Sequence, residues 1–405
     1  MKKLLFIFLL IQFFSCKQET HKEQMEFSKG TFGYDLNFLK KFHKDIIVLS
    51  DDSSKAQVLV LPAYQGRVMT STSEGATGQS FGWLNHDLIS TGKPTAHFTA
   101  YGGEERFWLG PEGGQFSIYF KKGKDFVFEN WYVPKEIDTE PFDLIAVDNT
   151  KAQFEKKMHL ENYSGTAFDL QVNRTISLLT ESEVKEYVGE VPDGLHVVGF
   201  QSDNTLVNTG KVSWDKKTGL LSIWILSMLN ADDSTTIIIP IRKSDSLNGA
   251  KMVTDDYFGK VPVNRLEKKD DMLFFMADGN YRSKIGISPA AALPIAGSYD
   301  SKNGVLTIAQ FSIHPDRRDY VNSLWKIQED PFSGDAVNAY NDGPIDGKQM
   351  GKFYELESSS PAAALAPGQS ISHFHRTMHF KGSKDKLNQL SLKIFGKQLD
   401  ELSLK

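Results

Sequence analysis

The stretch Ser-Ile-Ser-His-Phe-His-Arg-Thr-Met-His-Phe, residues 370–380, alternates between polar and apolar side chains in the manner of a β-strand. Successive side chains of a strand point to opposite faces, so the histidines share one face and the large apolar side chains share the other. We expect the apolar face to be core and the other face to carry three imidazoles. The first face holds Phe374, Met378 and Phe380, and the second holds His373, His375, Thr377 and His379.

Strand patterns of this kind recur along most of the chain, and turn signals such as Asp278-Gly279 and Asn303-Gly304 separate many of them. No long helical segments alternate with the strands, which disfavours a parallel α/β sheet. The sequence therefore predicts an all-β protein, a large antiparallel β-sandwich that forms one domain over residues 31–381. The clearest strands are expected at residues 46–49, 57–61, 115–120, 126–132, 153–160, 168–179, 221–225, 236–241, 272–276, 305–313 and 371–380.

Two helices are expected at the ends of this domain. Apolar residues at helical spacing predict a short helix over residues 36–43. In the last segment, residues 382–405, Ser383 is a candidate N-cap and Gly396 a candidate C-terminal stop. The apolar positions between them predict an amphipathic helix that packs on the sandwich.

Cys16 is the only cysteine of the chain, and it follows two lysines, an apolar run and the small residue Ser15. This pattern resembles a bacterial lipoprotein signal, in which residues 1–15 are removed and the cysteine is acylated. We expect an exported lipoprotein, periplasmic or on the outer-membrane surface, held at a lipid bilayer through Cys16 and a flexible tether over residues 16–30. The alternative is that Cys16 is a buried core thiol.

The composition is that of a soluble protein with a large core and a mildly acidic surface. The 405 residues are 40% hydrophobic and 12% aromatic, and no second cysteine is present to form an intrachain disulfide. The net charge is −5, and no basic stripe is visible, so no nucleic acid partner is expected.

A candidate acid–base site combines the histidine strand with the segment at residues 353–357. Alternation places Glu355 and Glu357 together on one strand face. The connection between the two strands is about a dozen residues long, which lets them lie near each other. Two other interpretations stay open: these side chains are ordinary solvent-exposed residues, or the His-x-His pair and a glutamate hold a divalent metal, for which spacing fixes no third ligand.

Two further segments carry candidate binding residues. Residues 97–114 combine four glycines with aromatic and charged side chains, which is typical of a functional loop; alternatively, the glycines only serve two hairpin turns. His314 lies at the rim of the strand at residues 305–313, where it suits acid–base chemistry or a structural hydrogen bond. The candidate substrate-binding residues are His97, Arg106, Trp108, Glu112, Glu355, His373 and Trp325.

Three segments resemble the galactose mutarotase-like superfamily, which includes the aldose 1-epimerases. They are Leu-Pro-Ala-Tyr-Gln-Gly-Arg-Val at 61–68, Tyr-Gly-Gly-Glu-Glu-Arg-Phe-Trp-Leu-Gly-Pro-Glu at 101–112, and the Leu-Glu at 356–357 with Leu-Ala-Pro-Gly at 365–368. The resemblance implies a large antiparallel sandwich, a carbohydrate ligand and Glu357 as the general base. The chain lacks the early Asn-Arg pair and the central His-x-Tyr-Phe-Asn-Leu of mutarotases, so the resemblance does not define a reaction.

Two hypotheses about function follow. In the first, a lipid-anchored carbohydrate-processing enzyme of epimerase, hydrolase or lyase type binds a sugar on a concave sheet face, with Glu357 as the base and His375 or His314 as the acid. In the second, the same sandwich is a non-catalytic carbohydrate-binding or scaffold lipoprotein. No cofactor is assigned in either.

Overall fold

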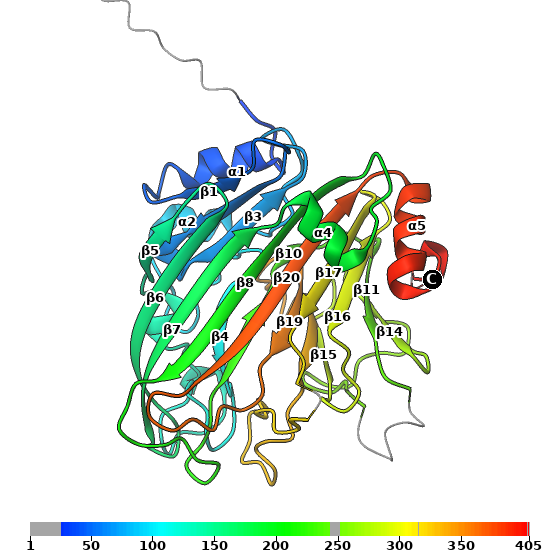
Figure 1. Cartoon of the computed structure of the whole chain (residues 1–405). Helices are drawn as coiled ribbons and strands as arrows, with labels where there is room; N and C mark the ends of the chain where they lie inside the picture. Colours follow the sequence, from blue (N-terminus) through cyan, green and yellow to red (C-terminus); the bar gives the residue numbers. More distant parts are fainter. Residues whose placement is uncertain (1–25, 244–251, 315, 403, 405) are drawn as a thin grey trace, which may run out of the picture.

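The structure is a computed structural model that describes residues 26–243, 252–314, 316–402 and 404. The predicted signal segment and Cys16 lie outside the described residues. Three antiparallel sheets make up the described chain, so the expected all-β antiparallel class is confirmed. Two large sheets pack face to face, and a small one covers one end beside the N-terminal helix (Figure 1).

The larger sheet has ten strands in the order β13-β14-β11-β16-β17-β20-β8-β7-β6-β5. Its central strand, β20, is the histidine strand, and it pairs with β8 over its whole length and with β17 over residues 375–381. The bounds, in sheet order, are Leu266–Lys268, Met272–Met276, Thr235–Pro240, Ile295–Asp300, Val305–Phe311, Ser370–Lys381, His196–Asn208, Ala167–Leu178, Lys151–Glu161 and Asp143–Val147.

The second large sheet has seven strands, β12-β15-β18-β19-β9-β4 with β10 paired to β19. These strands are Val253–Thr254, Ser283–Ile287, Val337–Asn341, Phe353–Ser359, Ser222–Leu226, Arg106–Gly110 and, for β10, Leu229–Asn230. The small sheet consists of β1, β2 and β3, which are Ile47–Ser50, Gln57–Leu61 and Arg67–Thr72. The main core lies between the two large sheets, where Phe107 and Ile225 of one sheet join the same apolar cluster as Phe154 and Phe200 of the other.

Helices cover the ends and the outer face of the ten-stranded sheet (Figure 1). The C-terminal helix α5 runs from Lys384 to Phe395 between Ser383 and Gly396, as predicted, and it packs on Met378 and Phe380 of β20. No helix among the described residues is long and apolar enough to cross a bilayer. The other helical segments are α1 Phe32–Leu39, α2 His86–Thr91, α3 Lys135–Asp138, α4 Glu181–Val188 and the 3₁₀ turns Pro62–Tyr64, Phe128–Asn130 and Leu399–Glu401.

Some predicted elements are shifted or wrong. The N-terminal helix starts four residues earlier than expected, because the Thr31 side chain caps it by accepting from the Tyr34 amide. The strands expected at 115–120 and 126–132 do not form. The two segments share one isolated bridge, Phe120 to Trp131, and their aromatic side chains pack as a cluster against Trp325. Aromatic residues are common in β-strands, and their abundance in these two segments therefore led to a wrong strand prediction.

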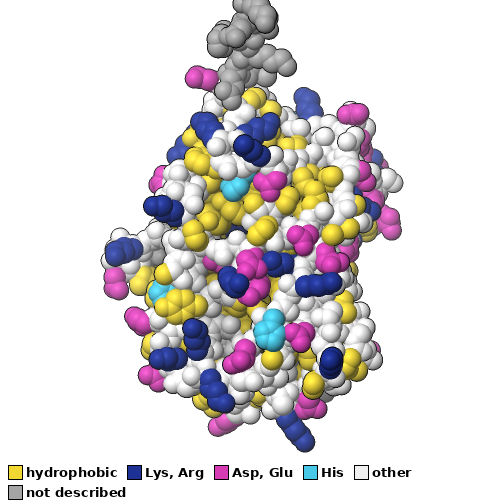
Figure 2. All heavy atoms as spheres, turned by 90° about the vertical axis from the view of Figure 1, so that its left-hand side faces the viewer, with side chains coloured by type: hydrophobic (Ala, Val, Ile, Leu, Met, Phe, Trp, Pro, Cys, Tyr) yellow, Lys and Arg dark blue, Asp and Glu magenta, His cyan; other side chains and the backbone are white. Residues whose placement is uncertain are grey.

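Charges of both signs lie side by side on the face of the molecule that carries the edge strand β5 (Figure 2). This edge is unusually apolar for an exposed strand, since Leu144, Ile145 and Val147 are all more than 40% exposed. Most of the remaining apolar side chains of the two sheets are buried.

A charged pair joins the sheets in the buried layer between them. Arg174 of β7 donates from Nη2 to Glu105 Oε1 at 2.8 Å and from Nη1 to Asn204 Oδ1 at 2.7 Å, and the side chains of the ion pair are fully buried. Burial raises the pKa of Glu105, and the Arg174 charge acts against that rise. A buried charge of this kind is tolerated only while it is paired.

We expect Arg174→Met to lower the free energy of unfolding by about 3–5 kcal/mol, because it leaves the Glu105 carboxylate buried without its cation. Urea denaturation measures this effect. Adding Glu105→Gln to the same chain should restore part of the loss. The control is Lys185→Met, which removes an exposed pair with Glu181 on α4 and should cost less than about 0.5 kcal/mol. Equal costs for the two single variants would contradict this account.

Candidate functional site

The outer face of the seven-stranded sheet presents polar and aromatic side chains instead of a continuous apolar surface. In the ladder, Glu357 of β19 lies opposite Asn338 of β18, and Lys284 of β15 lies opposite Tyr340. Residues directly opposite each other in a ladder share a face, so all four point the same way. On β9, Trp224 lies opposite Ser359 and joins the same face. Alternation along these strands thus builds one composite surface.

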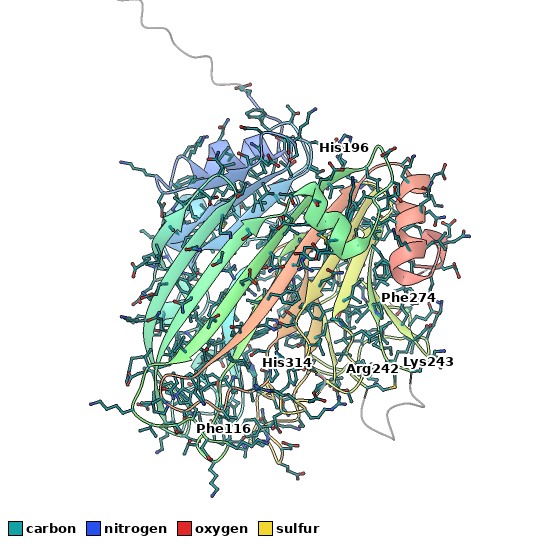
Figure 3. All side chains as sticks on the ribbon, viewed as in Figure 1. Phe116, His196, Arg242, Lys243, Phe274 and His314 are labelled. Carbon is teal, nitrogen blue, oxygen red and sulfur yellow. The ribbon has the colours of Figure 1, made fainter. Side chains whose placement is uncertain are left out.

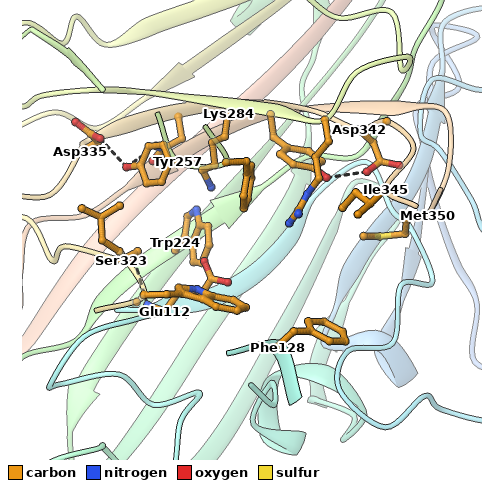
Figure 4. Close-up of a pocket in the computed structure, with 18 of the residues that line it drawn as sticks. Glu112, Phe128, Trp224, Tyr257, Lys284, Ser323, Asp335, Asp342, Ile345 and Met350 are labelled. Atoms are coloured by element: carbon orange, nitrogen blue, oxygen red, sulfur yellow. Dashed lines mark hydrogen bonds between the residues drawn. The ribbon is translucent and has the colours of Figure 1, made fainter. Parts of the chain in front are cut away.

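Loops rise around this surface and enclose a cavity of about 800 Å³. Figure 4 shows the side chains of Lys284, Trp224 and Glu112 facing the same space, with Phe128 at its edge. The volume lies in the range of sites that hold small organic ligands. The lining combines aromatic rings with carboxylates and cations, among them Trp224, Tyr257, Trp325, Glu112, Arg282 and Lys284.

Glu357 lies directly behind the cavity wall, with only 1% of its surface exposed. Its Oε2 accepts hydrogen bonds from Trp224 Nε1 and from Lys284 Nζ, both at 2.9 Å. Its Oε1 has no hydrogen-bond partner among the described residues. The carboxylate is therefore oriented by two donors that themselves line the cavity, and it keeps one acceptor oxygen unused.

Glu112 faces the cavity from a loop and is half-buried. Burial raises the pKa of its carboxyl group; the ammonium of Lys284 opposes the shift and the charge of Glu357 adds to it. The backbone amide of Glu112 donates a hydrogen bond to Ser323 Oγ at 3.2 Å, which fixes the loop at this residue. Two carboxyl groups in different electrostatic surroundings thus lie near one cavity, Glu112 in its lining and Glu357 behind its wall.

Arg106 and Glu355 form a second charged pair on the same face, with Nη2 and Oε1 3.0 Å apart. The guanidinium lies over the rings of Trp108 and Phe98, at 4.4 and 4.9 Å from their centroids. Burial raises the pKa of Glu355 to about 8, with Arg106 opposing the shift and Glu357 adding to it. Trp108 contacts Trp224 edge to face at 5.6 Å, so this pair adjoins the cavity wall without lining it.

His373 and His375 do not reach the cavity, contrary to the sequence-based expectation. Both are buried between the sheets, where Ser358 Oγ lies 2.8 Å from His373 Nε2 and 2.8 Å from His375 Nδ1. His379 is buried as well, 2.8 Å from Glu104. The histidine face of β20 is therefore inner core, and neither an open acid–base site nor a solvent-exposed surface.

The two other predicted histidines also lie outside the cavity lining. Figure 3 shows His314 at the end of the molecule opposite His196, beyond the last residue of β17. His97 places Nδ1 2.7 Å from the Trp131 carbonyl oxygen, and its ring packs against Phe128 at 4.7 Å. Phe128 lines the cavity, so the Phe128 ring separates His97 from the cavity.

The structure thus brings Glu112 and Trp325 together at the cavity, places Glu357 directly behind it and sets the Arg106, Glu355 and Trp108 cluster beside it. Sequence reasoning missed Lys284, Trp224 and Arg282. Trp224 lies inside a predicted strand, so alternation could have found it, whereas the short strand β15 that carries Lys284 was not predicted.

Among the described residues, no group of three or more His, Cys, Asp and Glu side chains could hold a metal ion.

Solved structures share this architecture. A provisionally assigned aldose 1-epimerase from Escherichia coli K12 superposes with a TM-score of 0.50 at 11% identity, over 82% of this chain and 98% of the other. A galactose mutarotase-like protein from Lactobacillus casei ATCC 334 has a TM-score of 0.48 at 10% identity, over 82% and 99% of the two chains. The comparison with curated proteins found no match.

The fold defines a β-sandwich protein of the galactose mutarotase-like type, as the sequence resemblance implied. Its polar cavity lies on the outer face of the seven-stranded sheet. The chain belongs to a family of unknown function, DUF6786, whose model matches residues 30–405.

The buried histidines predict how stability depends on pH. Burial lowers the pKa of His373 and of His375 from 6.5 to about 3, so both are neutral in the folded protein at neutral pH. The unfolded chain binds the extra protons as the pH falls below 6.5. Stability is therefore complete above that value and is lost toward pH 3, by about 1.4 kcal/mol per pH unit for each histidine.

Urea denaturation of the protein between about pH 7 and pH 4 measures this slope. His375→Gln and His373→Gln should each remove roughly one histidine's share of it, because glutamine hydrogen-bonds without titrating. His196→Gln, at the exposed start of β8, is the matched control and should leave the slope unchanged. An identical slope in all four proteins would contradict the assignment.

Proposed function

We propose that this protein binds a saccharide in the cavity and transfers protons to and from it, with Glu357 as the base and Glu112 as the acid. The observation that carries the proposal is a pair of carboxyl groups beside one cavity, with Glu112 in its lining and Glu357 directly behind its wall. Glu357 is in an ion pair with Lys284, whereas burial raises the pKa of Glu112. Carboxyl groups whose surroundings differ in this way are suited to opposite roles in proton transfer.

The lining supports a saccharide as the ligand. Trp224, Trp325 and Tyr257 offer ring faces against which the C–H face of a sugar can pack. Asp335, Asn338 and Asp342 add acceptors and donors for hydroxyl groups. A few polar groups set among aromatic rings give a ligand both affinity and orientation.

The acid differs from the one inferred from the sequence, because His375 and His314 are absent from the cavity lining. Glu112 takes this role in the proposal because it faces the cavity on the same side as Lys284 and Trp224 (Figure 4). A proton donor and an acceptor beside one sugar ring serve epimerisation, glycoside hydrolysis and elimination alike. The proposal therefore covers this group of reactions.

A second candidate is a carbohydrate-binding protein without turnover. It is favoured by the two hydrogen bonds that already occupy Glu357 Oε2, since a carboxylate held by an ammonium group is a weaker base. The same cavity would then retain the sugar through its rings and charges, and Glu357 would only position Lys284 and Trp224.

We also propose that the protein is exported and held at a bilayer through acylated Cys16, at the periplasm or the outer-membrane surface. The support is the sequence pattern around Cys16.

The first test of the proposed function follows proton NMR spectra of the domain with a panel of monosaccharides and oligosaccharides. We expect a time-dependent change in anomeric, linkage or vinylic signals. Glu357→Gln and Glu112→Gln should each slow it by about 10²-fold or more, because general acid and base steps contribute on this scale. Glu161→Gln, an exposed glutamate on β6, is the control.

Binding is measured in parallel through tryptophan fluorescence, since Trp224 and Trp325 line the cavity. Sugar binding without any spectral change over time would favour the carbohydrate-binding protein. A panel that neither reacts nor binds would overturn the saccharide proposal in both forms.

The anchor has a separate test in bacterial cells. Full-length protein should partition into the detergent phase of a Triton X-114 extraction and carry acyl mass at its N-terminus. Cys16→Ser should move it to the aqueous phase, because a single buried acyl chain already provides marginal membrane affinity and two or three provide stable anchoring. Aqueous partitioning of the unsubstituted protein would contradict lipidation.

A further inference from the structure

Arg282 stands out among the charged groups of the cavity. It precedes β15, lines the cavity and is partly buried. Its guanidinium carbon lies 3.7 Å from the centroid of the Phe258 ring, so the flat guanidinium group is held against an aromatic side chain. Within the described part of the chain, no hydrogen bond or ion pair satisfies the guanidinium nitrogens.

The neighbouring charged groups are engaged with other partners. Lys284 is in an ion pair with Glu357 at 2.9 Å. Asp342 Oδ1 accepts from the Tyr340 hydroxyl at 2.7 Å, and Asp342 Oδ2 accepts from the Gly351 amide at 3.0 Å. Asp335 accepts from the Tyr257 hydroxyl at 2.6 Å. Asp342 therefore takes these hydrogen bonds from neutral donors, and the Arg282 side chain remains part of the cavity lining.

Other buried arginines of the protein show what such a side chain ordinarily does. Arg106, Arg174 and Arg265 each contact a carboxylate of the chain within 3.0 Å, whereas Arg67 and Arg376 donate to carbonyl and side-chain amide oxygens. A guanidinium group that loses water on burial gains most from an anionic acceptor in its own plane, and a carboxylate fits its fork with two parallel hydrogen bonds. At Arg282 the chain itself supplies no such acceptor among the described residues.

We propose that the saccharide bound in this cavity is acidic, and that Arg282 binds the carboxylate of a hexuronic acid unit. This inference rests on the proposed function and names its ligand class. Lys348 lies at the exposed part of the cavity lining and adds positive charge on the path by which an anion enters.

The test compares the methyl glycosides of glucuronic, galacturonic and mannuronic acids with those of glucose, galactose and mannose. Fluorescence titration of the full-length protein at neutral pH measures each dissociation constant. We expect at least one uronide to bind roughly 10-fold or more tightly than its neutral counterpart, which is the scale of a charged hydrogen-bonded pair. Higher salt should weaken the uronide and leave the neutral glycoside unchanged.

Three variants locate the effect. Arg282→Gln should remove the preference for the uronide, because it should weaken uronide binding roughly 10-fold more than binding of the neutral counterpart. Arg282→Lys should retain part of the preference, because it keeps the charge and loses the planar fork. Arg317→Gln, which removes an exposed arginine outside the cavity lining, is the matched control and should change neither constant.

The outcomes separate this inference from the proposed function. Equal binding of uronides and neutral glycosides, or a preference that survives Arg282→Gln, would overturn the carboxylate assignment and leave the saccharide proposal standing. A preference for sulfated or phosphorylated sugars over uronides would also overturn it. If no glycoside of either series binds, both proposals fall together.

Discussion

The Ser358 hydroxyl lies between two imidazoles, at 2.8 Å from His373 Nε2 and 2.8 Å from His375 Nδ1, and this contact fixes which face of β19 is inward. A strand that slips by one residue turns every side chain to the other face. With Ser358 held against the ten-stranded sheet, Glu355 and Glu357 must both point outward. The chemistry of the cavity depends on that orientation.

Two carboxylates on one face of β19 create an electrostatic problem, because both are buried. Each carboxylate is neutralised by a cation from another strand of the sheet. Arg106 of β4 pairs with Glu355, and Lys284 of β15 pairs with Glu357. A buried charge without a partner is costly, so these four side chains depend on one another. Glu112 and Arg282 line the cavity and take no part in these two ion pairs, so both are available to a ligand.

The sequence predicted the fold class, the C-terminal helix and the common face of Glu355 and Glu357, because period-2 alternation and helix caps are local signals. It did not predict which strand face is covered. Alternation predicts Phe374, Met378 and Phe380 as the core face of β20, yet the histidine face is buried too. The seven-stranded sheet covers the histidine face, and α5 covers Met378 and Phe380 on the other. Burial on both faces depends on tertiary packing, which no single strand reveals. Arg282 was missed for the same reason: it carries no pattern, and only the enclosing loops make it a cavity residue.

The inner face of β20 and the outer face of the seven-stranded sheet both carry buried polar side chains, but different interactions stabilise them. On the inner face of β20, His373, His375 and His379 each lie within hydrogen-bond distance of a hydroxyl group, and burial keeps His373 and His375 neutral at neutral pH. Neutral hydrogen bonds cost less to bury than charges and still fix the register. The same burial removes these imidazoles from proton transfer at neutral pH. At the outer face, the buried charges are retained as the ion pairs Arg106–Glu355 and Lys284–Glu357, and the cavity beside them is the location of the proposed acid–base chemistry.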